Sequence, residues 1–106
     1  MRTHEFVVGG WIPAPGRSSR IGALLLGEFM DGGLHYVGKV DSGFDAKTLR
    51  DIGEALAIRA DSPFDESVPE PDAVFCKPDL HVPVEFVDFT ETGMLRRPVF
   101  SRFVLF

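Results

Sequence analysis

The alternation of apolar and polar residues is clearest between residues 22 and 40, which read GALLLGEFMDGGLHYVGKV. Two apolar-rich runs, 23–30 and 34–40, flank Asp31-Gly32-Gly33, and Asp-Gly between such runs is a strong signal for a β-hairpin. We therefore predict two long antiparallel strands. Because side chains alternate along a strand, one face of the second strand is expected to be apolar and the other charged. The apolar face holds Leu34, Tyr36, Gly38 and Val40, and the charged face holds His35, Val37, Lys39 and Asp41.

Further stretches have the β-branched and aromatic composition of strands, namely 5–12, 81–90 and 95–106, with a short one at 73–76. Gly9-Gly10 in the first stretch predicts a bulge or a sharp bend. Pro83 suggests an edge or barrel-rim position for its strand. Residues 13–20, with two prolines and a glycine, and the acidic, proline-rich stretch 59–79 are expected to be loops, and Glu91-Thr92-Gly93 is expected to be a turn.

One helix is predicted at 46–58. Asp45 is a natural N-cap, and Leu49, Ile52 and Leu56 recur at spacings of three and four, which makes one apolar stripe along the helix. The order of three strands, a helix and two strands matches an all-β fold, the five-stranded Greek-key β-barrel of the OB type with one α-helix between strands 3 and 4. An SH3-like barrel or a small α+β roll has a similar number of elements.

The length of 106 residues is typical of one domain, and we expect residues 1–106 to form a single OB-fold unit. Cys76 is the only cysteine, which excludes an internal disulfide and favours a reducing, cytoplasmic compartment. No signal-peptide pattern is present, and no apolar run approaches the ~20 residues of a membrane span, so no membrane partner is expected. His4, His35 and His81 share no metal-ligand spacing with Cys76, so no metal site is expected either.

The net charge is −5, and the acidic residues concentrate between residues 61 and 72. This balance argues against a grip on nucleic acid over the whole surface. It does not argue against a local one, because the clustering of cations on one face decides binding. The acidic stretch is either a solubilising loop or a surface for a basic partner. Trp11 and Tyr36 either stack on bases, as aromatic residues do in many OB-folds, or belong to the core.

Three stretches carry a resemblance that covers residues 5 to about 102: FVVGGWIP, GALLLGEFMDGGLHYVGKVDSGF and KPDLHVPVEFVDFTETGMLRRPVF. In order and spacing they resemble the C-terminal OB-fold region of bacterial ATP-dependent DNA ligases, particularly those of non-homologous end joining. The resemblance implies a DNA-binding domain that helps to clamp nicked or broken duplex DNA for ATP-dependent strand joining in DNA repair. The implied partners are duplex or nicked DNA and a ligase adenylation domain, in cis or in trans.

The same resemblance implies phosphate contacts at Arg17, Arg20, Lys39, Arg96 and Arg97. Taken alone, these residues also fit a plainer interpretation as solvated surface charges. Arg96 and Arg97 are adjacent, so on a strand they point to opposite faces, and at most one of them joins a single groove.

The sequence departs from the ligase pattern in two ways. The family has a basic–acidic–lysine motif for the ATP phosphates just after its PVF segment, whereas residues 101–106 read SRFVLF. In addition, Lys39, Lys47 and Lys77 lie in a predicted strand, helix and loop, without the context of a nucleophilic adenylation lysine. We therefore assign no catalytic residue and expect no cofactor in this chain, with ATP and Mg expected only for a full-length ligase. The chain alone is not expected to seal DNA.

A second interpretation is a stand-alone protein-interaction or regulatory OB module that has lost the DNA-ligase role. The acidic balance and the departures from the ligase pattern motivate it. Phe100, Phe103 and Phe106 would then form an association surface.

Overall fold

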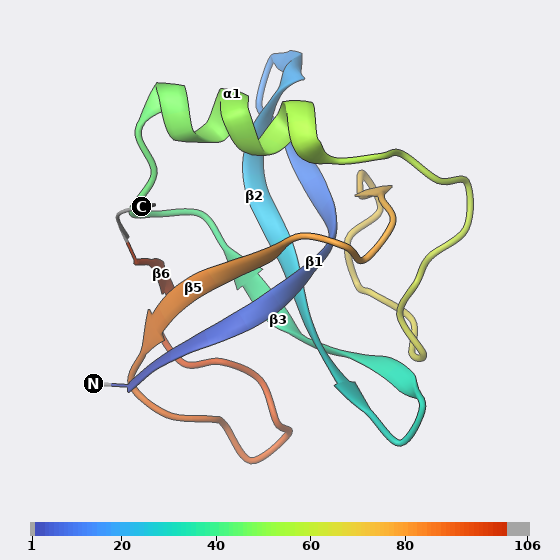
Figure 1. Ribbon diagram of the computed structural model, residues 1–106, viewed down its shortest axis with the longest axis vertical. Coiled ribbons are helices and arrows are strands. Elements are labelled where there is room, and N and C mark those ends of the chain that lie inside the picture. Colours follow the sequence, from blue (N-terminus) through green and yellow to red (C-terminus); the bar gives the residue numbers. More distant parts are fainter. Residues whose placement is uncertain (1, 102–106) are drawn as a thin grey trace.

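The computed structural model describes residues 2–101, with the side chains of 17–19 excepted. Its elements are β1 (Arg2–Ala14), β2 (Arg17–Met30), β3 (Gly33–Val40), α1 (Ala46–Ala55), β4 (Val74–Phe75), β5 (His81–Phe86) and β6 (Val99–Phe100). The strands form one antiparallel sheet in the order β3-β2-β1-β5-β6, and β4 pairs with β1. Figure 1 shows the sheet coiled around its own axis, with α1 across one end.

The predicted OB-fold is confirmed, although its sheet is not closed. Outside the ladders, two backbone hydrogen bonds connect the ends of the sheet. The Phe100 N–H donates to the Ser42 carbonyl at 2.8 Å, and the Leu95 N–H donates to the Val37 carbonyl at 2.7 Å. These bonds bring β6 and the connection before it next to β3 and the residues that follow it, without forming a continuous ladder. This arrangement is the partly open barrel typical of the fold.

The predicted central hairpin is confirmed, with Met30 paired to Gly33. The two residues between them, Asp31 and Gly32, have φ values of 51° and 84°. Positive φ at both central positions defines the type I′ turn, whose twist matches that of the flanking strands. A two-residue Asp-Gly connection therefore sets the register of β2 and β3.

The predicted division of β3 into one apolar and one charged face is wrong beyond Tyr36. The pairing of β2 with β3 shifts between Tyr36 and Gly38, so Val37 is an extra, bulged residue. Leu34 and Tyr36 belong to one buried cluster, whereas Val37 and Val40 belong to the other. A bulge inserts one residue and thereby exchanges the faces of all that follow, so β3 supplies apolar side chains to both sides of the sheet.

The predicted loop at 13–20 is also wrong. β1 continues to Ala14, β2 begins at Arg17, and these two residues are paired. Only Pro15 and Gly16 form the connection, and Gly16 has a φ of 73°. Proline at the first and glycine with positive φ at the second central position are the requirements of a type II turn. By contrast, the bulge predicted at Gly9-Gly10 is confirmed by the register shift there.

The predicted helix is confirmed, although it ends at Ala55 rather than at residue 58. The Asp45 carboxylate caps it by accepting a 2.7 Å hydrogen bond from the Thr48 N–H. Ile52 is buried, and Leu49 and Leu56 pack against the same cluster from partly buried positions. The helix thus covers one end of the main core with its apolar stripe.

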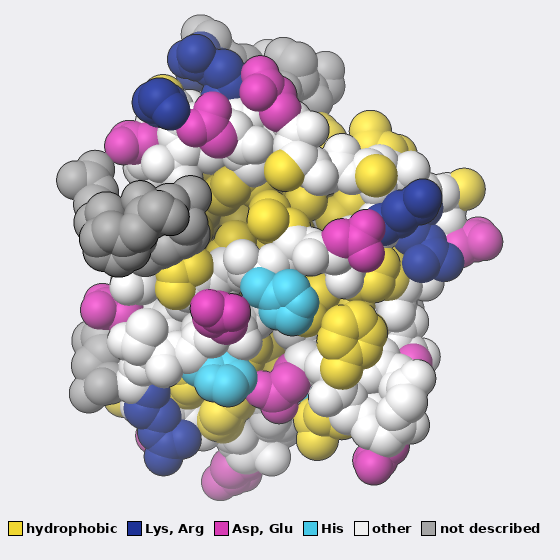
Figure 2. All heavy atoms as spheres, viewed as in Figure 1, with side chains coloured by type: hydrophobic (Ala, Val, Ile, Leu, Met, Phe, Trp, Pro, Cys, Tyr) yellow, Lys and Arg dark blue, Asp and Glu magenta, His cyan; other side chains and the backbone are white. Residues whose placement is uncertain are grey.

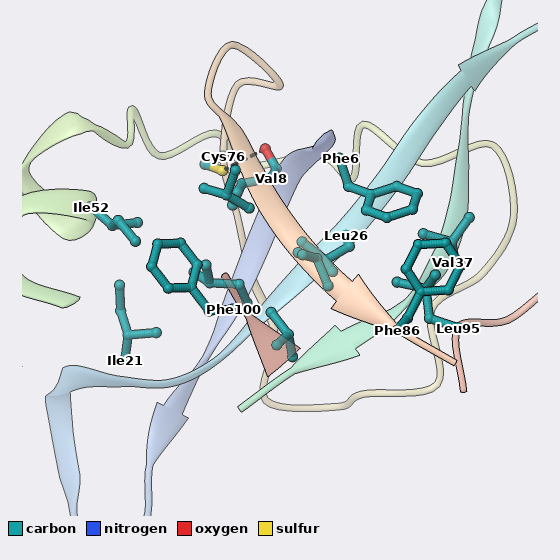
Figure 3. Packing of buried hydrophobic residues seen from close by; sticks show 14 residues of the cluster. Phe6, Val8, Ile21, Leu26, Val37, Ile52, Cys76, Phe86, Leu95 and Phe100 are labelled. Carbon is teal, nitrogen blue, oxygen red and sulfur yellow. Dashed lines mark hydrogen bonds between the residues drawn. The ribbon is translucent and has the colours of Figure 1, made fainter. Parts of the chain in front are cut away.

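The main hydrophobic cluster fills the inside of the coiled sheet. In Figure 3, Ile52 of α1 lies near Ile21 and Phe100 at one end of the cluster, and Phe86 lies near Val37 at the other. A second cluster packs on the opposite side of β1, β2 and β3 under the segment that precedes β4. Both faces of these strands are therefore covered.

The C-terminal strands are shorter than predicted. β5 ends at Phe86 rather than at residue 90. Of the strand predicted at 95–106, only Val99 and Phe100 form β6, residues 95–98 belong to the connection before it, and residues 102–106 lie outside the described residues. Of the two positions that Pro83 suggested, an edge or a barrel rim, the edge is wrong, because β5 pairs with β1 on one side and with β6 on the other. The predicted short strand at 73–76 is confirmed as β4.

Candidate nucleic-acid interface

Lys39 projects from β3 with 46% of its side chain exposed. Its ammonium nitrogen lies 3.2 Å from the Glu70 carboxylate, which is 21% exposed. Glu70 belongs to the acidic stretch 61–72 and is 31 residues away in sequence. Nothing local in the sequence indicates this pair, because only the tertiary fold brings the two side chains together.

The acidic stretch follows the edge strand β3 instead of extending into solvent. The Asp65 N–H donates to the Leu34 carbonyl at 2.8 Å. The Glu66 carboxylate accepts a 2.6 Å hydrogen bond from the Tyr36 N–H and lies 3.1 Å from Nδ1 of His35. Unpaired amide groups of an edge strand are ready binding positions for another chain. Here, a carboxylate of the same chain occupies one of them.

Phe64 holds the acidic stretch in place. Its side chain is 7% exposed and meets Tyr36 edge-on, with ring centroids 5.3 Å apart. Gly9 and Gly27 leave room for the ring, because a Cβ at either position would overlap it. Tyr36 is consequently a core residue and not a platform for bases, and burial, followed by the Glu70 charge, raises its pKa to about 12. Trp11 is partly buried against the main cluster.

Arg96 and Arg97 lie in the connection between β5 and β6, and not on a strand as predicted. Arg96 Nε donates to the Asp88 carboxylate at 2.7 Å, and the Arg96 and Asp88 backbones are also hydrogen-bonded. From the sequence, Asp88 was not identified as the partner of Arg96. The two residues are equally distant from Thr92 in the predicted turn, and residues placed in this way lie opposite each other when the chain folds back. Arg97 is exposed and has a φ of 53°.

Arg20 and Arg17 lie on β2 close to the hairpin that joins it to β1. Arg20 is exposed and borders a groove next to α1. Arg17 pairs with Ala14 through the backbone, and its side chain lies outside the described part of the chain.

The structure does not gather the described cations of this set, Arg20, Lys39, Arg96 and Arg97, into one patch. Figure 1 places the β1–β2 hairpin at one end of the molecule, beside α1, and the β5–β6 connection at the opposite end. In Figure 2, Lys and Arg side chains occupy separate positions around the rim of the visible face, with acidic side chains among them. A shared interface would extend along the whole domain, whose longest dimension is 33 Å.

His4 and Cys76 are two further titratable side chains among the described residues. His4 lies 3.4 Å from the Glu28 carboxylate, and burial, followed by the Asp79 charge, raises the pKa of Cys76 to about 11. Within residues 2–101, no three His, Cys, Asp or Glu side chains converge in a way that suits a metal ion. No helix in this part of the chain is long and apolar enough to span a membrane.

Residues 17–103 match the family described as the ATP dependent DNA ligase C terminal region, and the chain belongs to this family. The chain is 40% identical over 101 residues to the multifunctional non-homologous end joining DNA repair protein LigD of Mycobacterium tuberculosis. The aligned region covers 90% of this chain and 13% of that protein. The chain is 41% identical over 102 residues to the multifunctional non-homologous end joining protein LigD of Mycolicibacterium smegmatis, covering 91% and 13%.

The crystal structure of the ligase domain of M. tuberculosis LigD matches with a TM-score of 0.86 and 34% identity, over 93% of this chain and 34% of that one. The chain therefore spans 13% of the length of these LigD proteins and about a third of the solved ligase domain. The resemblance noted in the sequence is confirmed. It favours the ligase interpretation over a stand-alone interaction module.

Proposed function

We propose that this chain is the DNA-contacting OB-fold domain of an ATP-dependent DNA ligase. In this role it helps to clamp nicked or broken duplex DNA for strand joining in non-homologous end joining, within the bacterial cytoplasm. The family match over 17–103 carries the proposal, and the names of the LigD relatives supply the pathway. Exposed Arg20, Lys39, Arg96 and Arg97, with Arg17, are the proposed phosphate contacts.

The charges of the domain favour weak and strongly salt-dependent binding to DNA. Lys39 and Arg96 are each paired with a carboxylate, but both pairs are exposed. Such pairs contribute about 0–1 kcal/mol, so a DNA phosphate can replace the carboxylate at little cost. Because the chain carries a net charge of −5, attraction to DNA has to come from these local cations.

The covalent chemistry is proposed to reside in an adenylation domain, in cis or in trans. ATP and Mg²⁺ belong to that domain, because the described residues of this chain do not fit them. Lys39 and Lys47 are engaged in surface ion pairs, and the carboxylates form no metal-binding group. No step of adenylation is therefore derived for this chain.

Fluorescence anisotropy with a labelled nicked duplex tests the proposal. We expect binding at low salt that weakens as salt rises, and at least about tenfold weaker binding by the Lys39→Glu/Arg97→Glu double variant, because each lost contact costs about 1 kcal/mol or more. Lys47→Glu, an exposed cation on α1 that is not assigned to DNA, is the matched control and should bind as the wild type does. An absence of binding at low salt, or equal binding by the double variant, contradicts the proposal.

A further inference from the structure

A groove of about 540 Å³ lies between α1 and the β1–β2 hairpin. Figure 1 shows the hairpin passing behind the helix at this end of the molecule. The lining is mainly apolar and includes Trp11, Ile21, Leu49, Leu56 and Ile58. Ile58 is 69% exposed and lies at the edge of this apolar lining.

Two arginines border the groove. Arg20 and Arg50 are exposed, and within the described residues neither has a hydrogen bond or ion pair to a carboxylate. Glu54 is the acidic residue in the lining. The groove therefore has a local positive excess on a chain whose net charge is −5. By contrast, Lys39 and Arg96 are neutralised by carboxylates.

We propose that this groove binds a peptide segment of a protein partner, with apolar side chains in the groove and Asp or Glu side chains at the arginines. An apolar centre with a polar rim is the usual anatomy of a protein interface, and tryptophan and arginine are enriched among the residues that contribute most to binding. The charge of the rim selects an acidic partner.

The lining favours a peptide over a nucleic acid. Single-stranded nucleic acid is bound by exposed aromatic rings on which successive bases stack. Trp11 is the one aromatic residue in this lining, and it is partly buried against the core. The aliphatic residues around it offer contacts for leucine-like side chains rather than stacking surfaces.

Arg20 also belongs to the proposed DNA contacts, so the groove is tested through Arg50 and Ile58. Random 12-residue peptides without tryptophan are displayed and selected on the whole chain. Trp11 is the only tryptophan in the sequence, so its fluorescence reports occupancy of the groove directly. Ile58→Glu and Arg50→Glu change exposed residues, and circular dichroism verifies that both variants fold. Lys47→Glu, on the same helix but outside the groove, is the matched control.

We expect the recovered peptides to combine apolar with acidic residues and to change the Trp11 emission. Their affinity should fall about tenfold or more in Ile58→Glu and Arg50→Glu, as for residues at the centre of an interface, and should be unchanged in Lys47→Glu. The proposal is overturned if no peptide changes the Trp11 emission, if the peptides are basic, or if the variants bind them equally. It is also overturned if an oligo-dT strand, or a second copy of the chain detected as a dimer, occupies the groove in an Ile58-dependent way.

Discussion

The ammonium group of Lys39 lies 3.2 Å from the carboxylate of Glu70, although the two residues are 31 positions apart. The pair connects the acidic stretch to the cation of β3 that is proposed to contact DNA. If Lys39 contacts DNA as proposed, a negative group of the chain itself occupies the position that a phosphate would take.

Glu70→Gln should strengthen binding to nicked duplex DNA about two- to fivefold, because it removes a competing carboxylate whose exposed ion pair contributes about 0–1 kcal/mol. Anisotropy titrations at one salt concentration measure the change. Asp61→Asn removes the same charge from the same stretch, and no ion pair of Asp61 is seen in the described structure. An equal gain from both variants would mean that only net charge matters, and not the pair.

Phe64→Ala should lower the free energy of unfolding by about 3–4 kcal/mol, as truncation of a buried phenylalanine does. The ring is 7% exposed and packs edge-on against Tyr36. Urea denaturation measures the loss. Phe29→Ala, at a side chain that is 55% exposed, is the matched control and should cost less than about 1 kcal/mol. Similar losses at both positions would show that Phe64 is not the anchor of the acidic stretch.

Two glycine substitutions should separate backbone strain from overlap. Gly32 and Gly43 have φ values of 84° and 92°, but a Cβ at Gly32 meets nothing within 4 Å, whereas one at Gly43 overlaps the Phe100 carbonyl oxygen. Gly32→Ala should cost about 1–2 kcal/mol through left-handed strain alone. Gly43→Ala should cost at least about 1 kcal/mol more, through added displacement of β6. Equal losses in thermal unfolding would refute this distinction.

Stability at alkaline pH should depend on Tyr36. Burial, and then the Glu70 charge, raises its pKa from 10.0 to about 12. The unfolded chain releases this proton first, so stability that is fully present below about pH 10 is lost as the pH rises towards 12. Tyr36→Phe should therefore show a shallower decline of unfolding free energy over this range in urea titrations. Burial raises the pKa of the Cys76 thiol from 9.0 to about 11. Its ionisation contributes a similar decline in stability, which starts at a lower pH and is retained in Tyr36→Phe. An unchanged decline in Tyr36→Phe would contradict the assignment.

The features predicted correctly from the sequence depend on neighbouring residues. Asp31 and Gly32 provide both positive φ values of a hairpin turn, and Asp45 caps the helix that it precedes. The bulge at Val37 was missed because it is stabilised by the Leu95 N–H, a contact that only the folded chain makes. The loop predicted at 13–20 is wrong because Pro15 and Gly16 alone turn the chain, and the residues on either side of them continue the two strands.

The same distinction holds for the candidate site. The resemblance to the ligase family indicated which cations could contact phosphate. It gave no information about the carboxylates that pair with these cations in the folded chain. The Arg96–Asp88 pair was readable from the symmetry of a predicted turn, but the Lys39–Glu70 pair was not, because no local pattern links a strand to a distant loop.

The central claim is that specific cations of this domain contact DNA phosphates, and the salt dependence of binding to nicked duplex DNA tests it most directly. Each phosphate contact contributes about 0.9 to the slope of log K against log salt concentration. We predict that Lys39→Gln and Arg97→Gln each reduce the magnitude of the slope by about that amount, while Lys47→Gln leaves it unchanged. Slopes that are identical for all four proteins would contradict the account.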